Sequence, residues 1–176
     1  MTMRVTFGVD PGLSGAVAVL LDGEPGPILD MPTFHNGTAN EVDAAKLATF
    51  IREVRAGHPG AYFSVCIERV RAMPDRSGSA VRKMGAQSSF NFGDGFGQVK
   101  AVFRVLGMHP VLVEAQTWKH YYGLRGAEKD ASRELAIKRF PSSADRLARK
   151  KDHGRSEAML IALYHDNTDH AGRNAA

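Results

Sequence analysis

A short apolar run that ends in a charged residue constrains the fold of this chain more than any other feature. Residues 4–10 (RVTFGVD) are rich in β-branched and apolar side chains, and Pro11-Gly12 follow them directly. Proline and glycine at this point end a strand and favour a turn. We therefore expect a β-strand with Asp10 at its carboxyl end.

A second apolar run, residues 15–21, is expected to pair with the first in an antiparallel hairpin. It is followed by Asp22-Gly23, a pair typical of a tight turn or a strand end. Pro27 and Pro32 bracket a third run at residues 28–31. Because proline cannot donate a backbone hydrogen bond, this third strand is predicted to be short or to lie at an edge of the sheet.

Helical periodicity and buried strands alternate in the rest of the chain. Asn40 and Asp43 are typical of a helix start, and apolar residues then recur at spacings of three and four up to about Gly57. Residues 62–68 (YFSVCIE) are almost wholly apolar, as in a strand buried on both faces, and end in Glu68. Further along we predict two helical pieces within residues 79–106, separated near three closely spaced glycines, a strand at 110–113, and helices at 129–140 and 154–164.

This order of elements predicts an α/β fold with a mixed five-stranded sheet, an antiparallel hairpin plus parallel strands, flanked by helices. At 176 residues the chain suits one buried core, assigned to residues 1–165, with a disordered tail at 166–176. The longest apolar run, residues 16–21, is too short to span a membrane. Cys66 is the only cysteine, so no internal disulfide can form, and a soluble protein of the reducing cytoplasm is expected.

Two of the predicted strands end in carboxylates, Asp10 and Glu68. If these strands are adjacent and parallel, both side chains emerge at the same edge of the sheet. Two carboxylates there repel each other unless a cation lies between them, and Mg²⁺ prefers such oxygen ligands. The pair therefore indicates a magnesium site.

The last predicted helix adds acidic residues to this pair. Glu157 shares a helical stripe with Leu160 and Ile161, which places an acid on the core-facing side of the helix. Asp152 precedes the helix, where it is either a further ligand or a helix N-cap. With Asp152 as a ligand, the site has four carboxylates and can hold two Mg²⁺ ions. In such sites one metal activates water and the other stabilises the leaving oxygen of a phosphodiester.

Basic residues are concentrated beside these acids, in a chain with a net charge of +4. Residues 69–83 carry five basic side chains against one acid, and so do residues 146–155. Such clusters are typical either of ordinary solvated loops or of a surface that binds a polyanion. The seven histidines lack the spacing of a zinc site, and no Walker or serine-hydrolase motif is present, so a phosphodiesterase site has no strong competitor.

Three stretches resemble the RuvC-type Holliday junction resolvases, which are RNase H-like nucleases, and in particular their short phage-type members. The stretches are FGVDPGLSGAVAV at residues 7–19, CIERV at 66–70 and KKDHGRSEAMLIALY at 150–164, in this order. Trp118-Lys119 ahead of Gly123-Leu124, together with the glycine-rich helix before them, extend the resemblance to most of the chain.

The resemblance implies a structure-selective DNA endonuclease that resolves four-way junctions and leaves 5′-phosphate and 3′-hydroxyl ends. It implies two Mg²⁺ ions in each active site, with Mn²⁺ as a substitute, and neither a membrane nor a nucleotide cofactor. The expected partners are branched DNA and a second copy of the chain. A two-fold dimer suits a junction that is itself nearly two-fold symmetric.

The same resemblance assigns site residues. Either Asp152 or His153 supplies the third ligand, and Asp152 is favoured because a carboxylate suits Mg²⁺ better. The predicted catalytic and metal-binding residues are Asp10, Glu68, Asp152 and Glu157, with His153 and Lys151 in a secondary catalytic role. The residues predicted to bind DNA phosphates are Arg69, Arg71, Arg76, Arg82, Lys83 and Lys119.

Three alternatives remain open at this point. An actin-like or sugar-kinase ATPase also carries the pattern found from Asp10 to Gly15, but it needs a second domain for which this length leaves no room. A junction-binding protein without cleavage activity is a second possibility. A nuclease of the same chemistry that acts on flaps, forks or RNA-containing duplexes is the third, because loops and dimer geometry determine which substrate shape is recognised.

Overall fold

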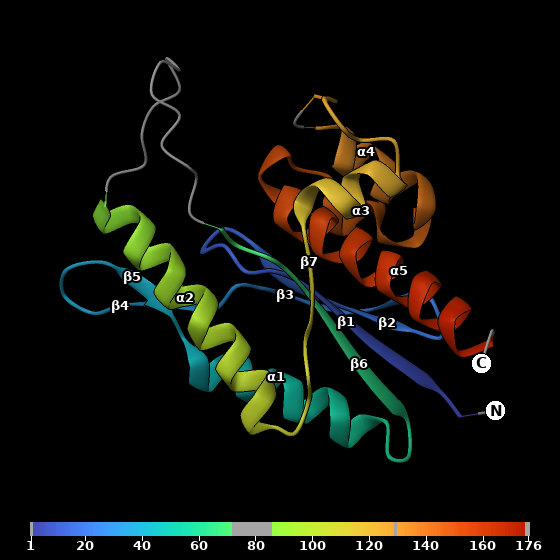
Figure 1. Ribbon diagram of the computed structural model, residues 1–176, viewed down its shortest axis with the longest axis horizontal. Coiled ribbons are helices and arrows are strands. Elements are labelled where there is room, and N and C mark those ends of the chain that lie inside the picture. The colour runs from blue at the N-terminus through green and yellow to red at the C-terminus, as the bar shows by residue number, and fades with distance from the viewer. Residues whose placement is uncertain (1, 72–85, 129, 175–176) are drawn as a thin grey trace.

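A five-stranded mixed sheet forms the centre of the computed structural model, which describes residues 2–71, 86–128 and 130–174 (Figure 1). Its strands lie in the order β3 (Glu24–Asp30), β2 (Ala16–Leu21), β1 (Arg4–Asp10), β6 (Tyr62–Glu68) and β7 (Val111–Val113). Strands β1, β2 and β3 pair antiparallel, whereas β1, β6 and β7 pair parallel. The predicted α/β fold with a mixed sheet is therefore confirmed.

The parallel pairing of β1 and β6 places two strand ends side by side. Val9 lies opposite Ile67, so Asp10 and Glu68 follow at the same edge of the sheet. Strand β7 continues this arrangement, because Val113 lies opposite Glu68. The chain segments that leave β1, β6 and β7 therefore start from one edge.

One face of the sheet is covered by α1 (Ala44–Gly57) and α2 (Ala86–Val105). The alternate residues of β1, including Phe7, point to this side, and Phe7 makes an edge-to-face contact with Phe103 of α2 at 5.7 Å between ring centroids. Asp43 caps α1 by accepting a hydrogen bond from the backbone N–H of Lys46, as its position before the helix predicts.

The other face is covered by three α-helices, which lie together on the opposite side of the sheet in Figure 1. They are α3 (Ala115–Tyr121), α4 (Ala131–Arg139) and α5 (His153–Asn174). Two 3₁₀ helices, η1 (Pro141–Leu147) and η2 (Lys150–Asp152), connect α4 to α5. The start of α5, which follows η2 directly, lies close to the edge of the sheet at which β1 ends.

Helix α5 lies directly against the backbone of β1 at Gly8. A Cβ atom at Gly8 would lie 2.2 Å from the carbonyl oxygen of Ala158 and 2.3 Å from the backbone nitrogen of Ala162. Only glycine permits two backbones to approach this closely. Gly8 therefore fixes the depth at which α5 lies against the sheet.

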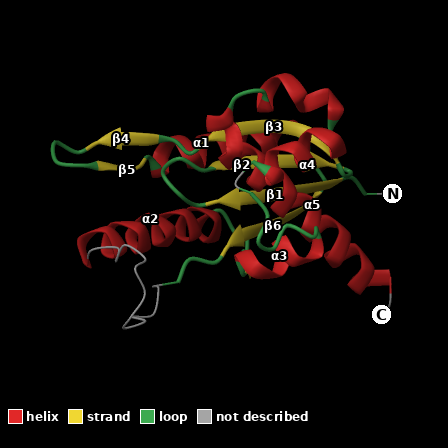
Figure 2. Cartoon of the chain, turned by 90° about the horizontal axis from the view of Figure 1, so that it is seen from above, coloured by secondary structure: helices red, strands yellow, loops and turns green. Residues whose placement is uncertain are grey.

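A small hairpin, β4 (Thr33–His35) and β5 (Asn40–Val42), was not predicted. Its residues are mostly polar, so they lack the alternation of a half-buried strand, and the turn is stabilised locally by Asn36, whose side-chain oxygen accepts hydrogen bonds from the backbone N–H groups of Thr38 and Ala39. Figure 2 shows the hairpin projecting at the same end of the molecule as the start of α2.

Several predicted boundaries are wrong. Helix α2 is continuous from Ala86 to Val105, so the interruption predicted near the three glycines is absent from this described segment. Residues 115–121 form a helix, α3, between the predicted strand at 110–113 and the predicted helix at 129–140, where none was predicted. Strand β3 begins at Glu24, before Pro25 and Pro27, which its place at the sheet edge tolerates.

The predicted disordered tail is also wrong, because α5 continues to Asn174. Asp166 is buried and accepts hydrogen bonds from Arg4 Nε at 3.1 Å and Thr6 Oγ1 at 3.1 Å, which join this part of α5 to β1. No helix within the described residues is both long and apolar enough to cross a membrane.

Candidate active site

Three of the four predicted acids come together at the carboxyl ends of β1 and β6. Asp10 and Glu68 end these strands, and each experiences the negative charge of Glu157 on α5. All three side chains are half-buried. Segments distant in sequence therefore converge on a single acidic site.

Asp10 is held in a tight turn. Its Oδ1 accepts a hydrogen bond from the backbone N–H of Gly12 at 3.3 Å. A Cβ atom at Gly15 would lie 2.2 Å from the Asp10 carbonyl oxygen, so the turn closes directly on the acid. Burial raises the pKa of Asp10, Glu157 raises it further, and His153 and Lys119 lower it. His153 and Lys119 therefore belong to the electrostatic surroundings of this carboxylate.

The pKa of Glu68 is shifted more strongly than that of Asp10. Burial raises its pKa to about 7, and the neighbouring charges of Glu157 and Asp10 contribute in the same direction. The opposing effect comes mainly from Trp118, whose indole Nε1 donates a hydrogen bond to Glu68 Oε2 at 2.8 Å. A carboxylate that is costly to ionise without a counter-charge is suited to binding a cation.

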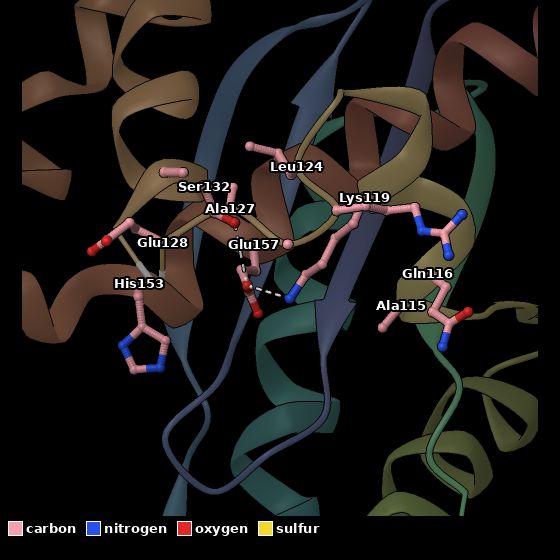
Figure 3. Close-up of a pocket in the computed structure, with 12 residues that line it drawn as sticks. Ala115, Gln116, Lys119, Leu124, Ala127, Glu128, Ser132, His153 and Glu157 are labelled. Atoms are coloured by element: carbon pink, nitrogen blue, oxygen red, sulfur yellow. Dashed lines mark hydrogen bonds and ion pairs between the residues drawn. The ribbon is translucent and has the colours of Figure 1, made fainter.

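Glu157 is paired with a lysine from α3, as Figure 3 shows. Lys119 Nζ lies 2.9 Å from Glu157 Oε1, and Ser132 Oγ donates a weaker hydrogen bond to the same oxygen at 3.3 Å. Lys119 was predicted to bind DNA, and here it supplies positive charge to the acidic site.

Asp152 lies in a different set of ion pairs. Its carboxylate accepts hydrogen bonds from the backbone N–H and the guanidinium of Arg149, including Nη2 at 2.8 Å, and Arg155 Nη1 is 3.8 Å away. These contacts lower the pKa of Asp152. Arg155 also binds Asp30 of β3, with 2.6 Å between Nη2 and Oδ2. Asp152 thus forms a capping box with Arg149 in η2 and joins η2 to the sheet through Arg155, rather than acting as the N-cap of the last helix that the sequence left open.

His153, rather than Asp152, lies beside the acids. It influences Asp10 electrostatically and lines the same hollow as Glu157 (Figure 3). Adjacent residues at a helix start point in directions about 100° apart, so only one of the two can face Asp10. The favoured assignment of Asp152 as the third ligand therefore gains no support from this placement, and the alternative, His153, does.

Gly154 permits this arrangement. A Cβ atom there would lie 2.5 Å from the carbonyl oxygen of Ser14 and 2.8 Å from Cα of Gly15. The first turn of α5 therefore rests directly on the turn that follows Asp10. No side chain fits at position 154 without disturbing this close contact.

A hollow of about 530 Å³ opens beside Glu157, between α3, the loop before α4 and the start of α5. Its polar lining includes Gln116, Lys119, Arg125, Ser132 and His153 (Figure 3). Arg125 and Gln116 were not singled out from the sequence, where nothing distinguishes them from other polar loop residues.

The donor chemistry fits a hard divalent cation. Asp10, Glu68 and Glu157 offer carboxylate oxygens and His153 an imidazole, and burial raises the pKa values of Asp10 and Glu68, so that a bound cation would favour their charged forms. Within the described residues, no three such groups lie close enough together to hold a metal ion as they stand.

The predicted DNA-binding residues are only partly described. Arg69 and Arg71 lie just after Glu68, and both pair with Glu114, with Arg71 Nη2 at 2.6 Å and Arg69 Nε at 3.4 Å from its Oε1. Lys151 is exposed on η2. Three further predicted residues lie outside the described residues: Arg76, Arg82 and Lys83.

Replacing Glu68 with glutamine is expected to stabilise the metal-free protein at alkaline pH. The folded protein keeps the Glu68 proton up to about pH 7, whereas a glutamate in the unfolded chain loses it near 4.5. Between these values the unfolded state binds fewer protons, so the free energy of unfolding falls as the pH rises. Glutamine avoids this loss, which is on the order of 1–3 kcal/mol.

Thermal and urea unfolding in EDTA at pH 5 and pH 8 would measure the effect. The matched control is Glu53→Gln, which changes an exposed acid on α1. A Glu68→Gln protein no more stable than wild type at pH 8 would contradict the burial of an uncompensated charge.

Comparisons with known proteins give one sequence match and several matches of fold. No family model matches the chain. The chloroplastic Holliday junction resolvase MOC1 of Chlamydomonas reinhardtii is 38% identical over 78 residues, which are 44% of this chain and 8% of that relative. Thermus thermophilus RuvC in complex with a Holliday junction substrate matches 96% of both chains with a TM-score of 0.61 and 15% identity. Another Thermus thermophilus RuvC structure matches the same shares with a TM-score of 0.50.

The chain is an α/β protein with a mixed five-stranded sheet and acids at the ends of β1 and β6. Its sequence match and its structural matches both lead to the RuvC-type Holliday junction resolvases, whose fold the chain shares. The predicted resemblance to that family is thereby confirmed.

Proposed function

We propose that the chain is a metal-dependent endonuclease that resolves four-way DNA junctions. The observation that carries the proposal is the convergence of Asp10, Glu68 and Glu157, from two strand ends and one helix, beside Lys119. Carboxylates on a rigid sheet edge are suited to holding divalent cations for phosphodiester hydrolysis. The relatives named for Holliday junctions supply the substrate class.

Asp10, Glu68, Glu157 and His153 would hold the metal, with Mg²⁺ as the expected ion and Mn²⁺ as a substitute. When bound in a pair, such ions activate water and stabilise the leaving oxygen of the phosphodiester. The expected products carry 5′-phosphate and 3′-hydroxyl ends. Lys119, which lies 2.9 Å from Glu157, would contact a DNA phosphate beside the acids.

The nuclease would act as a homodimer on branched DNA, because a two-fold pair of sites can cut symmetrically related strands. Arg69 and Arg71 lie directly after Glu68 and would contact phosphates near the cut. A cytoplasmic location, in a bacterial cell or a phage-infected host, remains the prediction from the lone cysteine and the DNA substrate.

A panel of labelled substrates tests the proposal. Four-way junctions, flaps, forks, RNA-containing duplexes and linear duplexes would be incubated with the protein in Mg²⁺, in Mn²⁺ and in EDTA. We expect paired, metal-dependent nicks in the four-way junction. Faster cleavage of flaps or forks would support the alternative nuclease, and binding without cleavage would support the non-cleaving module. ATP binding would support the actin-like alternative.

Substitutions at two adjacent positions distinguish the third ligand. His153→Ala is expected to slow junction cleavage by about 10²-fold or more, the scale of a positioned imidazole's contribution to catalysis. Asp152→Asn is expected to lower the free energy of unfolding by about 1–3 kcal/mol, because it weakens the hydrogen bonds from Arg149 to a buried carboxylate. It should retain metal-dependent cleavage at temperatures below its melting point.

Single-turnover cleavage and thermal unfolding of both variants would measure these effects. The reverse result, an inactive but stable Asp152→Asn and an active His153→Ala, would restore Asp152 as the ligand.

A further inference from the structure

Trp118 contacts the acidic site, although neither the metal ligands nor the DNA contacts include it. Its side chain is fully buried in the core cluster shared with α5, and its indole Nε1 lies 2.8 Å from Glu68 Oε2. An indole N–H can only donate a hydrogen bond. The buried indole N–H of Trp118 is therefore directed at a half-buried carboxylate at the end of β6.

The backbone holds Trp118 in this place. Strand β7 ends opposite Glu68, and the backbone N–H of Arg69 donates to the carbonyl oxygen of Val113 at 2.7 Å. Helix α3 begins at Ala115, only two residues later. The distance from Glu68 to the start of α3 is therefore set by the sheet register, and the packing of Trp118 sets the direction of its N–H group.

From this geometry we propose that Trp118 is a positioning residue, which holds the Glu68 carboxylate through Oε2 in the orientation in which it would bind a metal ion. The inference rests on the proposed function. A glutamate at the end of a strand otherwise samples several rotamers, and ordering it costs conformational entropy when the metal binds. Groups that orient metal ligands in this way typically contribute 10- to 100-fold to metal affinity or activity.

Trp118→Phe tests the proposal, because phenylalanine keeps an aromatic ring in the core but lacks the N–H donor. Leu147→Ala is the matched control, since Leu147 is fully buried in the same core cluster and its loss affects packing alone. Mn²⁺ binding to the DNA-free protein would be measured by titration calorimetry, and junction cleavage as a function of Mg²⁺ concentration. We expect Trp118→Phe to weaken Mn²⁺ binding about 10-fold or more and to require correspondingly more Mg²⁺.

Leu147→Ala should lower the melting temperature but leave Mn²⁺ affinity unchanged. Equal losses of affinity in both variants would overturn the proposal, because they would show a general effect of packing. Unchanged Mn²⁺ affinity in Trp118→Phe would overturn the role of Trp118 but not the proposed function. A wild-type protein that neither binds Mn²⁺ nor cleaves DNA would overturn both.

Trp118 also provides a test that needs no variant at this position. It is the only tryptophan in the chain, so protein fluorescence excited at the red edge of tryptophan absorption reports on its surroundings alone. The proposal is supported if paramagnetic Mn²⁺ quenches this fluorescence saturably and with the same midpoint as the calorimetric titration. The quenching should be lost in Glu68→Gln. Calorimetric Mn²⁺ binding that leaves the emission unchanged overturns it, even if Trp118→Phe fails to fold.

Discussion

Asp10→Asn is expected to reduce metal-dependent junction cleavage by at least about 10³-fold, the scale on which active sites lose activity when a principal electrostatic contribution is removed. Asparagine has nearly the same shape and can still accept the hydrogen bond from the backbone N–H of Gly12. The turn should therefore be retained. The variant loses the negative charge that interacts with His153 and Lys119, and with it the metal ligand proposed on the central strand.

Single-turnover cleavage of a labelled four-way junction in Mg²⁺ measures the effect, and gel-shift binding in EDTA shows whether DNA affinity survives. The matched control is Asp94→Asn, which changes an exposed acid on α2 whose recorded partner is Gln98. Wild-type cleavage by Asp10→Asn, or equal impairment by Asp94→Asn, would contradict the assignment of Asp10 to the catalytic site.

The positions of Asp10 and Glu68 were predictable because they follow from short, local sequence patterns. In each case an apolar run ends in an acid, and the helical connection between the two strands makes them parallel neighbours, as the register of Val9 with Ile67 confirms. The position of Glu157 was predictable for a similar reason, since the stripe it shares with Leu160 and Ile161 faces the core. Short-range pattern and standard topology thus account for three of the acids.

The identity of the remaining ligand was not predictable in the same way. Asp152 and His153 are neighbours in sequence, and which of them faces Asp10 depends on the rotation of α5 about its axis. That rotation is fixed by long-range contacts: Gly154 against Ser14, and Arg155 against Asp30. The local sequence around Asp152 and His153 does not reveal contacts with residues so distant along the chain.

The role of Trp118 was hidden for a related reason. Its place before Lys119 was visible in the sequence, but its hydrogen bond to Glu68 spans 50 residues and depends on the register of β7. The pairing of Arg69 and Arg71 with Glu114 is equally non-local. Sequence patterns locate the acids at the ends of strands, whereas the groups that orient them come from elements that meet only in the folded chain.

Gly8→Ala is expected to have the largest effect on stability, although it adds a single methyl group. The new Cβ atom would lie 2.2 Å from Ala158 O, 2.3 Å from Ala162 N and 2.7 Å from Ala162 Cα, and all three are backbone atoms that cannot rotate away. Helix α5 must then shift off β1. Overpacking of this kind typically lowers the free energy of unfolding by about 1–3 kcal/mol and occasionally more. Because the clashing atoms belong to the backbone, we expect a loss of about 3 kcal/mol or more for Gly8→Ala.

The shift also carries Glu157 and His153 away from Asp10, so cleavage should fall even at temperatures where Gly8→Ala remains folded. Gly93→Ala is the matched control: Gly93 lies in α2 with open space around its Cα, and alanine there is expected to stabilise the helix by about 0.5–1 kcal/mol. Chemical unfolding of both variants, with cleavage measured below the lower melting point, tests the argument. A Gly8→Ala protein as stable and as active as wild type would show that the contact between α5 and β1 does not set the geometry of the acids.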